Sequence, residues 1–332
     1  MRNRISLIFI LIVLSISNLF AFDKTGTTAA TFLQIPVSSR FAALGNAGVA
    51  GMGNAEQLAL NPASVKFSRK YSFSLSHMDW FADLQHQSVS FVMPVSENSQ
   101  MGIQLISFGG DEFEQTTIND QEGNGVMVDY GDLAVGLSGI TRLTDRFTVG
   151  MTGKYIRQDM FNEKASTFAF DIGTMLVTSL KGFSIGMSMT NLGGEMQLEG
   201  RDLYVDNADD GATTVYETSK WSLPLMFRTG VAWNLLGNQG YYSDSINSLN
   251  IFADARHLNE GITTLHLGTE YGFNETIFAR IGNTSGHDSE DWTFGAGVKL
   301  NLYQYLVFAD FAYIDLGDLD TVQRITLSFR QK

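Results

Sequence analysis

The chain has 332 residues, a formal net charge of −13 and no cysteine, and 44% of its residues are hydrophobic. Without cysteine, disulfide bonds and thiolate sites for catalysis or metal binding are excluded. The negative charge argues against a nucleic-acid partner. The 33 glycines and the recurrent Ser, Thr, Phe and Tyr favour strands and turns over helices.

The first 21 residues have the features of a secretory signal peptide. Arg2 and Arg4 precede an apolar run from Ile5 to Phe20, and Ala21 is a small residue at a cleavage point before Phe22. A retained N-terminal anchor is the alternative, but the run is short of the roughly 20 residues that a spanning helix needs. Removal of the two arginines would change the charge from −13 to −15. No later apolar run is long enough for a helix, so the exported protein is either soluble or crosses a membrane as a β-barrel.

Residues 26–65 are rich in small side chains. The glycines at 45, 48, 51 and 53 do not form Gly-x-Gly-x-x-Gly, and no P-loop lysine follows, so a nucleotide-binding loop is not expected. Glycine and alanine here would let the backbone pack closely inside a narrow space. Pro62 biases Asn61 away from helix, and the Asn61 side chain can bond the backbone of a turn ahead of a first strand near Lys70.

From residue 70 onward, apolar and polar residues alternate. Between Trp292 and Asn301 every second residue is apolar or alanine, and the residues between them are small or polar. Segments of this kind are near the roughly 9 to 11 residues that a tilted strand needs to cross a bilayer. The sequence therefore predicts an all-β fold, a transmembrane antiparallel β-barrel of about fourteen strands within residues 70–332. A soluble sandwich shares the alternation and remains the alternative. The predicted strands are 70–79, 86–95, 100–109, 127–140, 146–157, 165–178, 182–190, 221–235, 248–258, 263–273, 276–283, 291–301, 304–314 and 321–330.

The predicted connections fall into two classes. On one side they are short, with 236–247 as the exception. On the other side the connections are longer and rich in Asp, Glu, Asn and Gly, above all 110–126 and 191–220. Short periplasmic turns and long external loops are the pattern of outer-membrane barrels.

Charged residues of both signs occupy inward positions on the later strands, and we expect them to pair across the lumen because an unpaired charge there would be costly. A structural network is favoured, with a selectivity-setting role as the alternative. No catalytic residue, cofactor or metal site is predicted, because the five histidines lack zinc-type spacing and no Gly-x-Ser-x-Gly motif occurs. The inward charges are Arg228, Asp254, Arg256, Glu270, Arg280, Lys299, Asp310 and Arg324.

The order of several short motifs resembles the PorV/PorQ-type outer-membrane proteins, relatives of the FadL-like barrels. The N-terminal motifs are Phe32-Leu33-Gln34-Ile35, Arg40, Ala43 to Ala47 and Asn61-Pro62-Ala63. Later matches are Thr190 to Gly193, Leu223-Pro224, Gly268 to Tyr271, Arg280 to Gly282 and Arg324 to Arg330. Pro36, Leu60 and Ser64 depart from the residues usual in the family.

The resemblance implies a signal peptide over 1–21, an N-terminal hatch over 22–69 folded into the lumen, and a barrel over 70–332. The hatch motif would comprise Arg40, Gly45, Asn61, Pro62 and Ala63. It further implies a non-enzymatic role in type IX protein secretion or surface attachment, with outer-membrane lipid, exported client proteins and other secretion components as partners. Passage of hydrophobic small molecules, as in FadL relatives, is the alternative. A purely structural role in the envelope is a third hypothesis.

Overall fold

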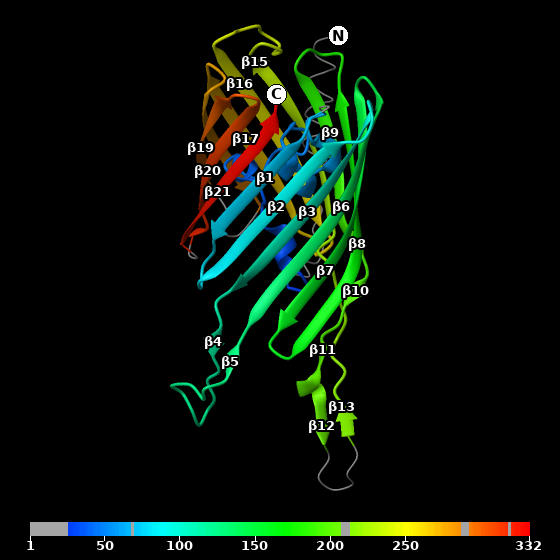
Figure 1. Ribbon diagram of the computed structural model, residues 1–332, viewed down its shortest axis with the longest axis vertical. Helices are drawn as coiled ribbons and strands as arrows, with labels where there is room; N and C mark the ends of the chain where they lie inside the picture. The colour runs from blue at the N-terminus through cyan, green and yellow to red at the C-terminus, as the bar shows by residue number, and fades with distance from the viewer. Residues whose placement is uncertain (1–25, 68–69, 207–212, 287–291, 318–319) are drawn as a thin grey trace, which may run out of the picture.

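The computed structural model describes residues 26–67, 70–206, 213–286, 292–317 and 320–332 (Figure 1). The predicted signal peptide, residues 1–21, lies outside the described residues. Among the described residues, no helix has the length and hydrophobicity needed to cross a membrane.

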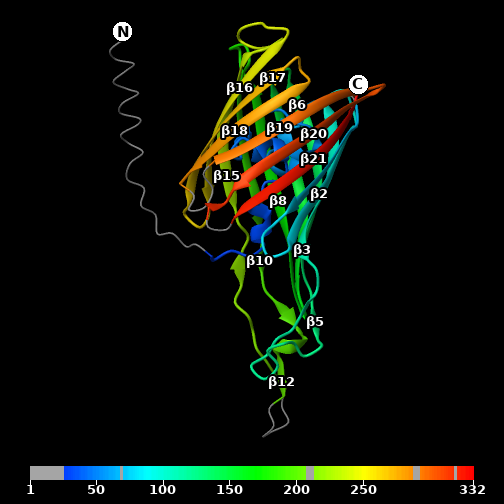
Figure 2. The ribbon, with the colours of Figure 1, turned by 90° about the vertical axis from the view of Figure 1, so that its left-hand side faces the viewer.

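Fourteen long strands of the described residues form one closed antiparallel sheet, which confirms the predicted barrel. Each long strand pairs with the next along the chain, and β1 pairs with β21 to close the ring (Figures 1 and 2). The barrel strands are β1 (Ser72–Asp79), β2 (Leu84–Pro94), β3 (Ser99–Gly110), β6 (Tyr130–Thr144), β7 (Phe147–Met160), β8 (Glu163–Val177), β9 (Phe183–Gly193), β15 (Met226–Leu236), β16 (Asn247–Leu258), β17 (Thr263–Phe273), β18 (Ile277–Ser285), β19 (Trp292–Leu302), β20 (Tyr305–Asp315) and β21 (Thr321–Gln331).

The side chains on these strands are arranged inside out relative to a soluble protein. Leu137, Leu265 and Ile325 are 58%, 55% and 53% exposed on the outer face, whereas Ser74, Glu270 and Arg324 are buried on the inner face. A soluble sandwich would bury the apolar face and expose the polar one. An apolar exterior around a polar interior is the pattern of transmembrane barrels, so the structure decides between the two alternatives left by the alternation.

Two of the predicted strands are divided in the structure. The sequence predicted a strand over 221–235, but β15 begins only at Met226, and Trp221–Ser222 forms a separate strand, β14, that pairs with β10 (Glu195–Met196). Pro224 lies between them and has no N–H to donate to a neighbouring strand. The predicted strand over 127–140 is likewise divided into β5 (Met127–Val128) and β6.

The two ends of the barrel differ as predicted. We call the end with short connections the turn end; there the segment 237–246 is the longest connection. At the other, the loop end, two hairpin arms project beyond the barrel (Figure 1). One arm is β4 (Phe113–Glu114) with β5, and the other carries β11 (Glu199–Gly200), η4 (Arg201–Leu203), β12 (Tyr204–Asp206) and β13 (Thr213–Val215).

The N-terminal segment, residues 26–67, contains η1 (Thr31–Gln34), α2 (Ser39–Ala42), η2 (Ala55–Ala59) and η3 (Pro62–Ser64). Its helices contact strands on different sides of the ring: α2 contacts β19 to β21, η2 contacts β1 to β3, and η3 contacts β6 to β8. A segment that reaches opposite walls of a closed barrel must lie within it, where Figures 1 and 2 show it in blue.

Candidate functional site

The N-terminal segment is attached to the wall near the loop end. The Ala29 N–H donates to the carbonyl oxygen of Ser222 at 2.9 Å, and the Ala30 N–H donates to Gln158 Oε1 at 2.9 Å. The Thr28 hydroxyl donates to Glu260 Oε1 at 2.6 Å. These bonds fix the start of the described chain against β7, β14 and the β16–β17 connection.

Arg40 belongs to a buried group of charges. Its Nε and Nη2 donate to the two carboxylate oxygens of Glu270, each at 2.8 Å, while Arg280 Nε donates to Glu270 Oε2 at 2.7 Å. Arg280 Nη1 also lies 2.7 Å from Asp310 Oδ1. Two arginines and two carboxylates thus alternate from α2 to β17, β18 and β20. Because the pairs satisfy each other, this buried charge is compensated.

Side chains of the barrel wall form hydrogen bonds with both N–H groups and carbonyl oxygens of the backbone in residues 44–49. Asp254 Oδ2 accepts the N–H groups of Gly48 at 2.7 Å and Val49 at 2.8 Å. Arg228 Nη1 donates to the carbonyl oxygen of Asn46 at 2.6 Å. Non-helical backbone at membrane depth needs such partners, because no bulk water is present to supply them.

Gly45 adds three further bonds to the same stretch. Its N–H donates to Thr293 Oγ1 at 2.8 Å, and its carbonyl oxygen accepts from His266 Nδ1 at 2.7 Å and Thr284 Oγ1 at 3.1 Å. Gly45 has a φ of +63°, which favours glycine. A Cβ here would also lie 2.6 Å from the backbone nitrogen of Asn283.

Arg324 is fully buried on β21, and the described residues supply it with no carboxylate partner. Its Nη1 donates to the carbonyl oxygen of Val37 at 3.2 Å and to Ser76 Oγ at 2.9 Å. Its Nη2 donates to His86 Nδ1 at 2.8 Å. The guanidinium therefore joins the N-terminal segment to β1 and β2 through neutral acceptors.

Asn61, Pro62 and Ala63 form a tight turn against β7 and β8. Asn61 Oδ1 accepts the Ala63 N–H at 3.0 Å and thus caps η3, and Pro62 is its first residue. Asn61 Nδ2 donates to the carbonyl oxygens of Val49 at 2.8 Å and Thr174 at 3.1 Å. One amide group therefore bonds its own turn, another part of the segment and the barrel wall.

Glycines in the wall make room for this contact. A Cβ at Gly173 would overlap the Asn61 side chain, and one at Gly150 would lie 2.7 Å from Ala63 N. A Cβ at Gly282 would overlap the backbone of residues 44 and 45 on the opposite side. The segment and the wall therefore meet at backbone distance, which only glycine permits.

The predicted charges do not form one network. Arg40, Glu270, Arg280 and Asp310 are joined, Arg228 and Asp254 bind the backbone of the N-terminal segment, and Arg324 is apart from both. Arg256 Nε donates to Thr264 Oγ1 at 3.1 Å within the wall. Lys299 pairs with Glu275 at 2.9 Å at the turn end.

Sequence reasoning missed two polar groups. Lys154 on β7 pairs with Asp171 on β8 at 2.9 Å and also donates to Asn191. Glu56 on η2 accepts the hydroxyls of Ser74 at 2.6 Å and Ser328 at 3.2 Å. The signal for the first pair was present, since both residues occupy inward positions of the alternation. Glu56 lies on a helical segment, where strand alternation gives no information.

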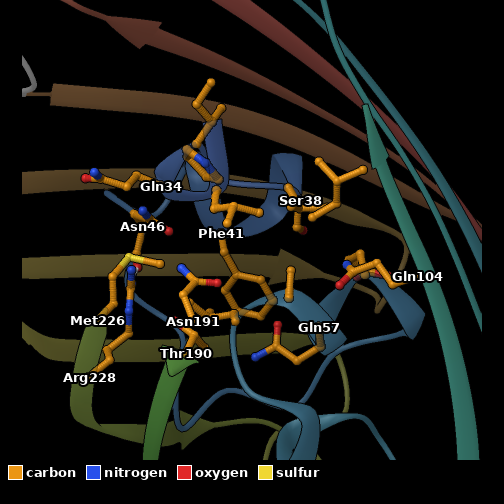
Figure 3. Close-up of a pocket in the computed structure, with 18 of the residues that line it drawn as sticks. Gln34, Ser38, Phe41, Asn46, Gln57, Gln104, Thr190, Asn191, Met226 and Arg228 are labelled. Atoms are coloured by element: carbon orange, nitrogen blue, oxygen red, sulfur yellow. Dashed lines mark hydrogen bonds between the residues drawn. The ribbon is translucent and has the colours of Figure 1, made fainter. Parts of the chain in front are cut away.

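The lumen is narrow where the N-terminal segment crosses it. A cavity of about 50 Å³ lies between Phe41 and Gln57 of the segment and Gln104, Asn191 and Arg228 of the wall. Figure 3 shows these side chains around it. A cavity known to bind benzene has a volume of roughly 150 Å³, about three times larger, so this space is suited to a few water molecules. Within the described part of the chain, no cluster of three His, Asp or Glu side chains is suited to a metal ion.

Several solved structures of bacterial proteins share this architecture. The toluene transporter TbuX of Ralstonia pickettii is 12% identical with a TM-score of 0.55, over 90% of this chain and 97% of TbuX. The toluene transporter TodX of P. putida is 10% identical with a TM-score of 0.57, over 88% of this chain and 97% of TodX. A Pseudomonas aeruginosa FadL homologue is 10% identical with a TM-score of 0.54, over 89% of this chain and 98% of the homologue. At such identities the similarity concerns the fold alone.

No curated protein matches the sequence significantly. Residues 21–200 match the family described as type IX secretion system protein PorV. That match spans more than half of the 332 residues and agrees with the motifs noted above and with the outer-membrane barrel fold. The chain therefore belongs to the PorV family of type IX secretion system proteins.

Proposed function

We propose that this protein is a non-enzymatic outer-membrane component of type IX protein secretion or surface attachment. Its partners would be exported client proteins and other secretion components, and lipid would surround its apolar outer face. The observation that carries the proposal is the family match over residues 21–200. Export through the predicted signal peptide and cleavage after residue 21 are part of the same proposal.

The two arms at the loop end are the surface that best suits a protein partner. Ile118 is 93% exposed, and Met127, Val215 and Tyr216 are also exposed on these arms. Single exposed apolar residues are normal, but several on projecting arms favour contact with another protein. The arms also present short unpaired strand edges to which a partner can add.

Affinity purification from outer membranes tests this role. A tag placed in the exposed turn at 303–304 should recover secretion components and an exported client. A variant with the 201–217 arm replaced by a short glycine linker should recover less client while its barrel still forms. Purification that recovers neither class of protein from wild-type membranes would contradict the proposal.

We further propose that residues 22–69 serve as a hatch that keeps the lumen closed. The proposal is supported by the small central cavity and by the bonds that tie the segment to opposite walls. Replacement of Asn61 and Pro62 together by alanine and glycine should admit vancomycin or reduce the barrel yield. Unchanged exclusion with an unchanged yield would remove this role.

Passage of hydrophobic small molecules is the second candidate. It is supported by the shared fold of the toluene transporters and by a cavity of about 300 Å³ at the loop end, where Met160, Met196, Leu198 and Trp221 face residues 26–31. Deletion should then reduce uptake of fatty acids or aromatic hydrocarbons. Unchanged uptake of both classes would remove this candidate and leave the secretion role intact.

A further inference from the structure

A cavity larger than the two described above opens at the turn end of the barrel. It has a volume of about 560 Å³ and lies between the end of the N-terminal segment, the 237–246 connection and strands β16 to β21. Pockets of this size accommodate small organic ligands. We call it the turn-end vestibule.

Its carboxylates are already paired with cations. Glu270 pairs with Arg40 and Arg280, Arg280 also pairs with Asp310, and Glu275 pairs with Lys299. Because these carboxylates already have cationic partners, they do not neutralise the other cations that line the vestibule.

Two other cations reach the same cavity without such partners. Lys66 and Arg330 line the vestibule, and neither forms an ion pair with a carboxylate of the described residues. In a chain with a net charge of −13, this leaves a local excess of positive charge. A confined cavity with uncompensated charge attracts counter-ions.

Side-chain contacts position the cation of Arg330, whereas Lys66 is fixed only through its backbone. Arg330 Nη1 donates to Asn54 Oδ1 at 3.2 Å, and its guanidinium lies 5.3 Å from the centre of the Phe308 ring. The Lys66 N–H donates to the carbonyl oxygen of Gly53 at 2.8 Å, which fixes the backbone from which its side chain extends. Lys66 is exposed overall, but desolvation of its ammonium group beside the vestibule walls, together with the nearby cations Arg330, Lys299 and Arg40, lowers its pKa. A bound anion would relieve this repulsion.

We propose that the turn-end vestibule binds a small organic anion whose carboxylate or phosphate group contacts Lys66 and Arg330. The planar guanidinium suits bidentate contact with either group, and the lysine adds a point charge. Phe308, whose ring lies against the Arg330 guanidinium, also lines the vestibule and would contact the apolar part of the ligand. The site goes beyond the proposed secretion role and does not depend on it.

Isothermal titration of the full-length protein in a nonionic detergent tests the site with butyl phosphate, butyrate and inorganic phosphate. We expect saturable binding of butyl phosphate or butyrate at one site per barrel. Comparison of the two identifies the preferred head group. Inorganic phosphate that binds as tightly as butyl phosphate would overturn the assignment of an organic ligand. Absence of saturable binding by all three probes at millimolar concentration would overturn the site itself.

Matched variants separate this site from general attraction of anions. Lys66→Gln and Arg330→Gln should each weaken binding about tenfold, because each removes a charge-assisted contact. Lys181→Gln removes the same charge in the turn 178–182 at the same end, where Lys181 donates to Ser243 outside the vestibule, and should leave binding unchanged. Heat-modifiable migration shows that each barrel has folded. Equal weakening by Lys181→Gln would overturn the proposal.

Discussion

At the scale of residues, polar groups inside the barrel bind the N-terminal segment as well as one another. The inward alternation predicted which strand charges face the lumen, and Glu270, Arg280 and Asp310 do meet there, together with Arg40 of the N-terminal segment. It could not predict that Asp254 and Arg228 bind backbone groups, because backbone acceptors and donors carry no sequence signal. The close contacts between wall glycines and the N-terminal segment could not be predicted either, because they too involve backbone atoms, which carry no sequence signal.

Glu270→Gln should destabilise the protein because Arg40 would lose its buried carboxylate partner. Removal of one partner from a buried pair costs about 3 kcal/mol. The control is Glu275→Gln, which changes the same charge at an exposed pair with Lys299 and should cost less than about 1 kcal/mol. The free energy of unfolding in urea checks both. Equal losses would show that the buried group of charges does not hold the segment.

Gly282→Ala should displace residues 44 and 45 from the wall, because the added Cβ overlaps their backbone. Trypsin should then cleave at Arg40 in the folded barrel, whereas the wild type resists. Gly139→Ala is the control, since a Cβ at Gly139 meets no atom within 4 Å. Resistance of Gly282→Ala equal to that of the control would contradict the close contact.

At the scale of elements, the strands were predictable and the N-terminal segment was only partly so. Alternation marks a strand with one lipid face and one inner face, which is why the fourteen strands were found from the sequence. Pro224 lies shortly before the first residue of β15 and prevents the strand from beginning earlier. The tight connections between strands could be recognised by their Gly, Asn and Asp residues. The helices of the segment have only three to five residues each and are too short to show periodicity, so composition alone indicated close packing.

Glu56 on η2 should make stability depend on pH. Burial raises the pKa of its carboxyl above the ordinary value of 4.5. The folded state therefore binds the proton more tightly, so the stabilising contribution is complete below about pH 4.5 and is lost as the pH rises through the raised value. Glu56→Gln should consequently gain stability relative to the wild type between pH 4.5 and neutral pH. Urea unfolding across this range measures the difference.

The exposed Glu122→Gln, in the loop after β3, is the control for Glu56. The stability differences of the two variants from the wild type are compared over the same pH interval. If Glu56→Gln behaves in the same way as Glu122→Gln, the buried carboxyl does not titrate with folding.

At the scale of the whole molecule, the inverted distribution of side chains requires a lipid environment. Leu137 is 58% exposed near the middle of β6. Leu137→Arg should reduce the free energy of folding into lipid vesicles by about 2–4 kcal/mol, the usual cost of arginine near the bilayer midplane. Ile118→Arg, in a loop-end arm, should have little effect. Equal losses of folding free energy for Leu137→Arg and Ile118→Arg would contradict the prediction that β6 crosses the bilayer.

The account depends most on the N-terminal segment lying inside a closed outer-membrane barrel, and the cysteine-free sequence makes this directly measurable. Ser39 Oγ on α2 and Thr326 Oγ1 on β21 lie 2.7 Å apart and are buried. The double variant Ser39→Cys and Thr326→Cys should form an intramolecular disulfide in intact outer membranes, detected as a linked peptide by mass spectrometry. Ser39→Cys with Ser138→Cys, on β6, should not form one. Free thiols at 39 and 326 in folded, heat-modifiable protein would contradict the account.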